Sequence, residues 1–267
     1  MMYGLLDSTP VERHGNLWFK RDDYFNIGDV YGSKIRVAYS LLSEAKEKGY
    51  TSVVCANFRY SPQFLIVATV ADMLGLKSIG FTSVGEKTSF VSQAELLGME
   101  IRKVKYGYAN VIQARAREYA EKFGGFLVPF WLKCSEAVRL AENQGLGTVF
   151  DESVERVVVA VGSGVNLAGL LRAFNTIENK KPVLAVLVGS DCRRFVFKQC
   201  PWPWVQEKVQ FVKASQAYLD NSFYNRVNDV DVDSRYEGKA IPYLRPGDLF
   251  WLIGRSVVCA VANSKEI

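Results

Sequence analysis

Short apolar runs alternate with amphipathic segments through the first half of the chain. The predicted strands are apolar or β-branched and comprise 51–55, 77–81, 100–104 and 126–129. The predicted helices between them have helical hydrophobic spacing and comprise 61–74, 89–98 and 111–123. Gly75 follows the first of these helices and predicts its C-terminal cap. The alternation predicts an α/β fold with parallel-rich, twisted sheets flanked by helices.

The second half continues this pattern with more deeply apolar strands. The predicted elements are a helix at 134–144, a strand at 157–161, a helix at 165–176 and strands at 183–188 and 248–253. The run at 157–161 is uninterruptedly apolar, as expected for a strand that is buried on both faces of a sheet. Between 191 and 228 the pattern is weak. There we expect an irregular segment at 201–204 and a strand at 209–212.

Composition indicates an ordered globular protein of one large domain or two that share a core. The chain has 267 residues, of which 49% are hydrophobic. No apolar run reaches the roughly 18–20 residues of a membrane span, and the first residues lack a signal-peptide pattern. We therefore expect no membrane partner and a cytoplasmic, reducing location. The cysteines are odd in number and widely spaced, which predicts free buried thiols; they are Cys55, Cys134, Cys192, Cys200 and Cys259.

Charge and histidine content narrow the possible chemistry. The net charge of +5 permits an anionic partner but does not require one. Basic residues are dispersed, and pairs such as Lys180-Lys181 and Arg193-Arg194 indicate solvated faces rather than a binding patch. His14 is the one histidine, which excludes a multi-histidine metal site. It precedes the predicted strand 17–20, where a structural or surface role is expected.

A glycine-rich turn follows the buried strand 157–161 and leads into a helix. The turn comprises Gly162, Ser163, Gly164, Val165 and Asn166. Backbone N–H groups at such a turn, together with the helix N-terminus, can bind an anion. Leu167 stands where a dinucleotide-binding loop would have its third glycine, and no Walker sequence is present. An anion site and a plain tight turn are both compatible with this segment.

Two further segments carry candidate catalytic groups. Lys34 follows Gly32-Ser33 at the start of a helix, where it is either a solvated first-turn residue or an amine that forms a Schiff base. Tyr236-Glu237 offers a phenol and a carboxylate. A reactive amine, a phosphate cradle and an acid/base pair are together what a pyridoxal 5'-phosphate (PLP) enzyme requires. Ser61, before Gln63, is either a helix N-cap or part of a site for a substrate carboxylate.

These segments resemble fold-type II PLP enzymes, and within them the family of 1-aminocyclopropane-1-carboxylate deaminase and D-cysteine desulfhydrase. The matching segments follow the family's order and are Thr9-Pro10, Lys20–Asp23, Gly32–Arg36, Ser61–Gln63, Gly162–Gly169 and Asp233–Ala240. The last is the most specific, because five residues agree in order and spacing. The resemblance implies a two-domain, tryptophan synthase beta-like fold. The larger, PLP-binding domain would take 1–41 and 131–267, and the smaller inserted domain 42–130. It also implies a homodimer.

The resemblance also implies roles for single residues. Lys34 would form the Schiff base and move a proton, Tyr236 would act in acid/base chemistry, and Glu237 would face the pyridine nitrogen of PLP. The phosphate would lie at the 162–166 turn. Ser61 and Gln63 would contact the substrate, and Tyr224 would be a second active-site tyrosine. No metal is implied.

Departures from the family pattern leave the substrate open. Pro62 replaces an asparagine, 130–133 replaces a glycine-rich substrate loop, and 253–255 replaces Thr-Gly-Gly. The first expectation is a lyase or deaminase that acts on the α-amino group of a small amino-acid-like substrate. The alternative is a decarboxylase or lyase for an aminoacyl-modified nucleobase in DNA, with Arg59 and Arg255 on phosphates. A third hypothesis is a non-catalytic PLP-binding homologue. The presence of Lys34, Tyr236 and Glu237 together argues against it.

Overall fold

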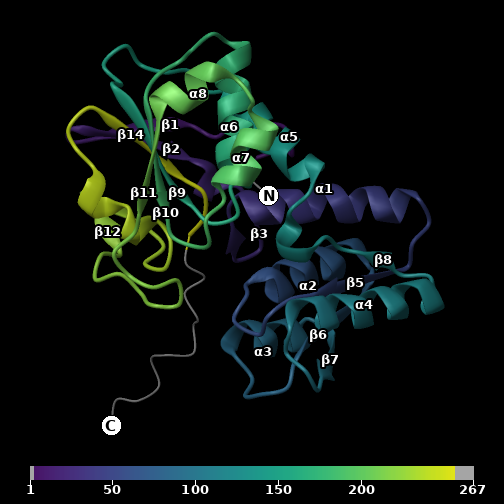
Figure 1. The fold of residues 1–267 in the computed structure, drawn as a ribbon. Helices are drawn as coiled ribbons and strands as arrows, with labels where there is room; N and C mark the ends of the chain where they lie inside the picture. The colour runs from purple at the N-terminus through teal and green to yellow at the C-terminus, as the bar shows by residue number, and fades with distance from the viewer. Residues whose placement is uncertain (1–2, 256–267) are drawn as a thin grey trace. The chain divides into compact units, whose positions relative to one another are not determined.

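A computed structural model describes residues 3–255, which divide into two compact units, each built on its own sheet (Figure 1). Unit 1 contains 3–26, 31–33 and 134–255, and unit 2 contains 27–30 and 34–133. Helix α1 (Ser33–Glu47) groups with unit 2 from Lys34 onward. The expected domain boundary at 41–42 falls inside this helix, and the division into a larger PLP-binding domain and a smaller inserted domain stays a prediction.

Unit 1 is centred on a six-stranded, mostly parallel sheet. The strand order is β1-β2-β14-β9-β10-β11. These strands are β1 (Val11–His14), β2 (Leu17–Arg21), β14 (Asp248–Leu252), β9 (Arg156–Val161), β10 (Val183–Leu187) and β11 (Val209–Lys213). Only the β1–β2 hairpin is antiparallel. The inner strand β9 is almost entirely buried, as its apolar sequence predicts.

Different structures cover the two faces of this sheet. On one side lie the helices α5 (Ser135–Leu146), α6 (Val165–Thr176), α7 (Arg193–Gln199) and α8 (Pro203–Lys208) (Figure 1). On the other face, Phe19, Val158 and Phe250 form a core with residues of the C-terminal segment, including Val230 and Ala240. That segment contains β12 (Arg226–Val227), β13 (Val230–Asp231) and the 3-10 turns Glu237–Lys239 and Ile241–Tyr243. The candidate residues Tyr236 and Glu237 are therefore held on the sheet by this core.

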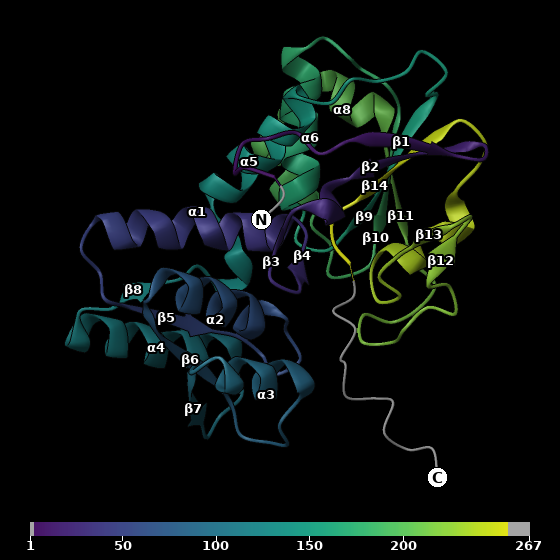
Figure 2. The same ribbon diagram turned by 180° about the vertical axis from the view of Figure 1, so that it is seen from behind.

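Unit 2 is a four-stranded parallel sheet between helices (Figure 2). Its strand order is β7 (Glu100–Val104), β6 (Lys77–Ser83), β5 (Ser52–Ala56) and β8 (Phe126–Leu127). Its helices besides α1 are α2 (Gln63–Leu74), α3 (Ser89–Leu96) and α4 (Ala109–Phe123). Ala116 of α4 packs with Val54 and Phe81 on one face. Because side chains alternate along a strand, Gly80 faces the opposite side, where it makes room for Phe64 of α2.

The remaining short elements connect these layers. They are the 3-10 turn Asp22–Tyr24, β3 (Asn26–Ile27), β4 (Val30–Tyr31) and the 3-10 turn Phe130–Leu132. The sequence missed α7 and α8. At α8, Pro203 occupies the first turn, where a missing N–H costs nothing. The expected cap at Gly75 is present, with φ of 67°.

The composition led to expectations about the cysteines, about membrane spans and about metal sites. Among the described residues, Cys55, Cys192 and Cys200 are buried and Cys134 is half-buried, and none of the four forms a disulfide. Cys259 lies outside the described residues. Between residues 3 and 255, every helix is too short or too polar to cross a bilayer. The same part of the chain holds no grouping of His, Cys, Asp and Glu suited to a metal ion.

Candidate functional site

The 162–166 turn joins the end of β9 to the start of α6 in unit 1. Gly164 has φ of 83°, a left-handed conformation that favours glycine, and no side chain caps the helix. The first intrahelical hydrogen bond runs from the Ala168 N–H to the Gly164 carbonyl. The amides of residues 165–167 therefore have no partner within the helix, which is the geometry of an anion site.

Gly169, the last glycine of the matching segment Gly162–Gly169, is a glycine for a packing reason and not for the conformation of the turn. A Cβ on Gly169 would lie 2.5 Å from the Cβ of Ala141 on α5. This glycine therefore allows α5 and α6 to pack closely and does not belong to the turn. Gly162, by contrast, lies beneath Tyr236, whose ring carbon Cε1 would be 3.0 Å from an added Cβ.

The residues just before Lys34 are fixed to unit 1. The Ser33 N–H donates to the Ile253 carbonyl at 2.8 Å, and the Ser33 hydroxyl accepts from the Asn166 side-chain amide at 3.0 Å. Gly32 has φ of 100°, and a Cβ there would overlap the Ile253 carbonyl oxygen. Glycine is required here because another backbone segment approaches this position. Lys34 is the second residue of α1, directly after this anchored position.

Glu237 presents a buried carboxylate oxygen that lacks a partner. Its side chain is almost completely buried, and Oε1 accepts from the N–H groups of Ile253 at 3.0 Å and Gly254 at 3.3 Å. Oε2 is buried without a hydrogen bond to any described residue. Burial, reinforced by Asp233, raises the pKa of Glu237 to about 8. An unsatisfied buried acceptor is costly, so this oxygen is suited to a donor, and best to a cationic one.

Tyr236 is paired with a second tyrosine that the sequence did not reveal. Its hydroxyl lies 2.8 Å from the hydroxyl of Tyr218, and the two rings meet edge to face at 6.0 Å. Burial and the neighbouring Tyr218 raise the pKa of Tyr236 well above its ordinary value. The Asp233 side chain accepts from the Tyr236 N–H at 3.0 Å and so orders the turn that carries it.

Tyr218 is held in place by Lys239, a residue of the segment Asp233–Ala240 that also carries Tyr236. The fully buried Lys239 donates from Nζ to the carbonyls of Ala217 at 2.6 Å and Tyr218 at 3.1 Å. Tyr218 lies between 191 and 228, where the sequence pattern is weak, and the sequence carried no signal for its pairing with Tyr236. Tyr224 contacts this cluster through its backbone, because its carbonyl lies against Gly238, and its side chain is 45% exposed. A catalytic role for Tyr224 stays a prediction.

The other candidates belong to unit 2. The Ser61 hydroxyl accepts from the Gln63 N–H at 3.2 Å, but the N-cap residue of α2 is Pro62 and no side chain caps this helix, so the N-cap role considered for Ser61 is not seen. Gln63 is 1% exposed, its Oε1 accepts from Asn57 at 2.6 Å and its Nε2 donates to the Pro129 carbonyl at 3.1 Å. The amide of Gln63 is thus engaged at both ends in holding two loops together. A substrate contact by either residue stays a prediction.

The segment that replaces the glycine-rich loop has an unusual backbone. Trp131 and Leu132 have φ of 58° and 55°, which is strained for large side chains. The Trp131 indole N–H donates to Asn57 Oδ1 at 3.0 Å, and the Phe130 ring lies 6.0 Å from that of Phe58. Asn57 therefore links Gln63 and Trp131, and the turn is fixed by specific contacts.

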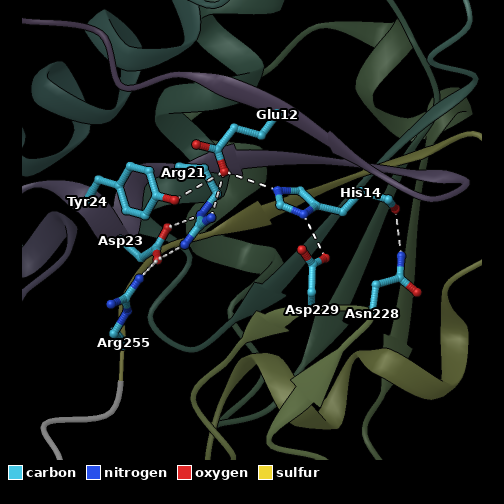
Figure 3. Close-up of polar contacts among 8 residues, drawn as sticks. All are labelled: Glu12, His14, Arg21, Asp23, Tyr24, Asn228, Asp229 and Arg255. Atoms are coloured by element: carbon cyan, nitrogen blue, oxygen red, sulfur yellow. Dashed lines mark hydrogen bonds and ion pairs between the residues drawn. The ribbon is translucent and has the colours of Figure 1, made fainter.

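A chain of ion pairs in unit 1 ends at the segment that binds Glu237 (Figure 3). Asp23, which is 1% exposed, pairs with Arg21 at 2.9 Å and with Arg255 at 3.3 Å. Arg21 also pairs with Glu12, whose carboxylate contacts His14. Arg255, one candidate phosphate contact, is thus engaged with an acid. The other, Arg59, donates to the Val84 carbonyl and lies over the Tyr60 ring.

We expect Asp23→Ala to lower the free energy of unfolding by about 3–5 kcal/mol, because it leaves the buried Arg21 guanidinium without the buried carboxylate that accepts two of its hydrogen bonds. Urea denaturation measures this change. Asp229→Ala is the matched control, since Asp229 pairs with His14 but is 74% exposed, and its loss should cost less than about 1 kcal/mol. Equal costs for the two variants would contradict the structural role of this ion-pair chain.

Comparison with known proteins identifies the class that this fold and site define. The family model for "Pyridoxal-phosphate dependent enzyme" matches residues 5–210. That range includes Lys34 and the whole 162–166 turn. The chain belongs to this family of PLP-dependent enzymes.

Individual relatives agree with this assignment. The chain is 31% identical over 206 residues to a Thermotoga maritima protein named "Putative 1-aminocyclopropane-1-carboxylate deaminase", and the match covers 68% of this chain and 64% of that protein. A Pyrococcus abyssi protein of the same name is 27% identical over 66% of this chain and 56% of its own length. The chain thus spans less than two thirds of the length of these curated relatives.

Solved structures agree on the fold. The crystal structure of an ACC deaminase homologue has a TM-score of 0.77 at 21% identity and covers 94% of this chain and 90% of its own. Maize serine racemase has a TM-score of 0.65 at 14% identity, with coverage of 94% and 88%. The expectation of a fold-type II PLP enzyme fold is confirmed.

Proposed function

We propose that this chain is a PLP-dependent lyase that releases the α-amino group of a small amino acid or amino-acid-like substrate as ammonia. The observation that carries the proposal is the buried Oε2 of Glu237, which lacks a hydrogen-bond partner among the described residues. A protonated pyridine nitrogen is the cationic donor that this oxygen requires. The names of the Thermotoga and Pyrococcus relatives support the reaction class.

The residues of the chain fit the parts of the cofactor. The amides of residues 165–167, which have no partner within the helix, suit its phosphate, Glu237 suits its ring nitrogen, and Lys34 supplies the amine that would hold its aldehyde carbon. When bound, PLP withdraws electrons from the bonds at the α-carbon of an amino-acid substrate. The side chains then have to place the substrate and to move protons.

Proton movement falls to Lys34 and to the pair of phenols. Because the pKa of Tyr236 is raised, this residue is a neutral phenol at pH 7 and can donate its proton. The hydroxyl of Tyr218 lies 2.8 Å from that of Tyr236, so the two hydroxyls share a hydrogen bond that fixes the orientation of the Tyr236 O–H group. We assign Tyr236 to acid/base chemistry and Tyr218 to its positioning.

We expect Tyr236→Phe to lower kcat about 10²–10⁴-fold, because the acid/base group is removed. Tyr218→Phe should lower kcat about tenfold and shift the alkaline limb of the pH profile to lower pH, since Tyr218 helps to raise the pKa of Tyr236. Steady-state kinetics across pH measures both effects. A larger loss in Tyr224→Phe than in Tyr218→Phe would reverse the assignment of the second tyrosine.

Product analysis tests the proposed reaction. The PLP-loaded protein is incubated with 1-aminocyclopropane-1-carboxylate, D-cysteine and serine, and ammonia and 2-oxo acids are quantified. From 1-aminocyclopropane-1-carboxylate, water is consumed and 2-oxobutyrate and ammonia form in equal amounts. Serine yields pyruvate, ammonia and no other carbon product. PLP-loaded protein that releases ammonia from none of the amino acids tested would contradict the proposal.

A second candidate function keeps the cofactor and changes the substrate. The fixed turn at 130–133, with its strained Trp131 and Leu132, replaces a flexible glycine-rich loop and exposes 39% of the Trp131 side chain. This change favours a substrate larger than a free amino acid, such as an aminoacyl group carried on a nucleobase of DNA. Decarboxylation would release carbon dioxide and leave the amine on the base. Carbon dioxide from such DNA, with no ammonia from free amino acids, would identify this reaction.

A further inference from the structure

In unit 2, a groove of about 630 Å³ lies between β7, an edge strand of the sheet, and α4, the helix that follows it in the chain. Five of the side chains that line it are cations: Arg102, Lys103, Lys105, Arg115 and Lys122. In sequence they are spread over 21 positions, from Arg102 to Lys122, which is why they did not stand out as a patch. The packing of α4 beside β7 gathers them at one surface.

This groove holds most of the excess charge of the protein. Its lining contains five cations and one carboxylate, Glu118, which gives 5 − 1 = +4, whereas the whole chain has a net charge of +5. Arg115 pairs with Glu118 at 2.6 Å, and Arg102 pairs with the adjacent Glu100. Lys103, Lys105 and Lys122 have no ion pair with any described residue. The surface is therefore complementary to an extended anion.

Aromatic rings lie among these cations. The rings of Phe81 and Tyr119 are 5.5 Å apart, and those of Tyr119 and Phe123 are 4.5 Å apart. The guanidinium of Arg102 lies 4.3 Å above the centre of the Tyr119 ring. Phe123, at the outer end of this series, is 58% exposed. An exposed ring beside lysines leaves a face on which a planar base can stack.

The chain beyond β7 continues the same pattern. Lys105 lies 5.8 Å from the centre of the Tyr106 ring. Tyr106 and Tyr108 are 61% and 72% exposed. Exposed rings next to cations suit a strand of phosphates and unstacked bases, whereas an acidic peptide would use the cations alone.

We propose that this groove binds single-stranded nucleic acid. Its cations contact the phosphates, and Phe123 together with the Tyr119–Arg102 stack contacts the bases. A duplex hides its base faces, so a single strand is the better ligand. The inference concerns binding by unit 2 and does not rest on the proposed reaction, so either can fail alone. If both hold, a substrate carried on nucleic acid becomes the favoured one.

Fluorescence anisotropy with an oligodeoxythymidylate of about 12 nucleotides tests the proposal, using the full-length, PLP-loaded protein. The groove variant is Lys103→Ala/Lys105→Ala/Lys122→Ala, in which all three positions are exposed. The control is Lys180→Ala/Lys198→Ala/Lys208→Ala, which removes the same charge from exposed positions of unit 1. We expect the groove variant to lower the slope of log affinity against log salt by about 2 and the control to leave it unchanged.

A ring variant separates stacking from charge. Phe123→Ala should weaken binding about tenfold without changing the salt slope, because it removes a stacking face and no charge. Phe223→Ala is its control, since Phe223 is 97% exposed and lies in unit 1. Three results would overturn the proposal: no binding by wild type, equal losses in the groove and control variants, or equal binding of poly-glutamate. Equal binding of duplex DNA with no effect of Phe123→Ala would overturn the assignment to single strands.

Discussion

Replacement of Lys34 by alanine should lower kcat at least about 10³-fold, because one amine both holds the cofactor and moves a proton. Lys34 is the second residue of α1, and the position before it is anchored through the Ser33 N–H and hydroxyl. These anchors involve no atom of the Lys34 side chain, so they should survive in the variant. Steady-state ammonia release measures the loss.

Two comparisons make the Lys34 result specific. Lys34→Arg keeps the positive charge but removes the primary amine, and it should be as inactive as Lys34→Ala. Lys48→Ala, at an exposed lysine just beyond the end of α1, should keep wild-type kcat. If Lys34→Arg retained a large share of the activity, charge rather than amine chemistry would be the contribution of this position.

The second large effect is a pH dependence of stability that comes from Glu237. Its pKa is about 8 in the folded chain against an ordinary value of 4.5, so the folded state keeps a proton that the unfolded state loses. Stability of the cofactor-free protein should therefore fall as pH rises from about 4.5 to 8, by on the order of 4 kcal/mol. Glu237→Gln should remove this fall, because it cannot ionise. Urea denaturation of both proteins at pH 5 and pH 8 measures the difference.

The same variant reports on the cofactor. A protonated ring nitrogen at Oε2 would offset the ionised carboxylate, so added PLP should stabilise wild type more than Glu237→Gln at pH 8. Glu155→Gln is the control, because that carboxylate is 66% exposed, and it should behave as wild type. A Glu237→Gln variant with an unchanged pH dependence would show that the buried carboxyl does not titrate in this range.

The fold was predictable because its strands are strongly apolar and its helices end at clear signals. The run at 157–161 predicted a buried central strand, and Gly75 predicted the end of α2. Helices α7 and α8 were missed because they have seven and six residues, too few for a periodic pattern. The pattern of a helix does not show which unit it packs against, so the sequence alone does not assign α1, which groups with unit 2 from Lys34 onward.

Residues of the candidate site could be predicted where a short stretch of sequence by itself shows the chemical groups and the turn that a site needs. Glu237 and the 162–166 turn are such positions, since a glycine turn after a buried strand and a carboxylate beside a tyrosine are visible in the chain. Tyr218 was missed because its pairing with Tyr236 is tertiary and lies 18 positions away. Gly32 belongs to a segment that the sequence singled out. The reason that a glycine is required there is the close approach of the Ile253 carbonyl, which lies at a strand end more than 200 residues later in the chain.

Reductive trapping tests the central claim, that this chain holds PLP through Lys34 in a site built around Glu237. The protein is loaded with PLP, reduced with borohydride, digested and mapped by mass spectrometry. For wild type, we predict one pyridoxyl group, attached to Lys34. For Lys34→Arg, from which excess PLP is removed before reduction, we predict no pyridoxyl group on the peptide that contains position 34. A pyridoxyl group on another lysine in wild type, or on no lysine at all, would contradict the account.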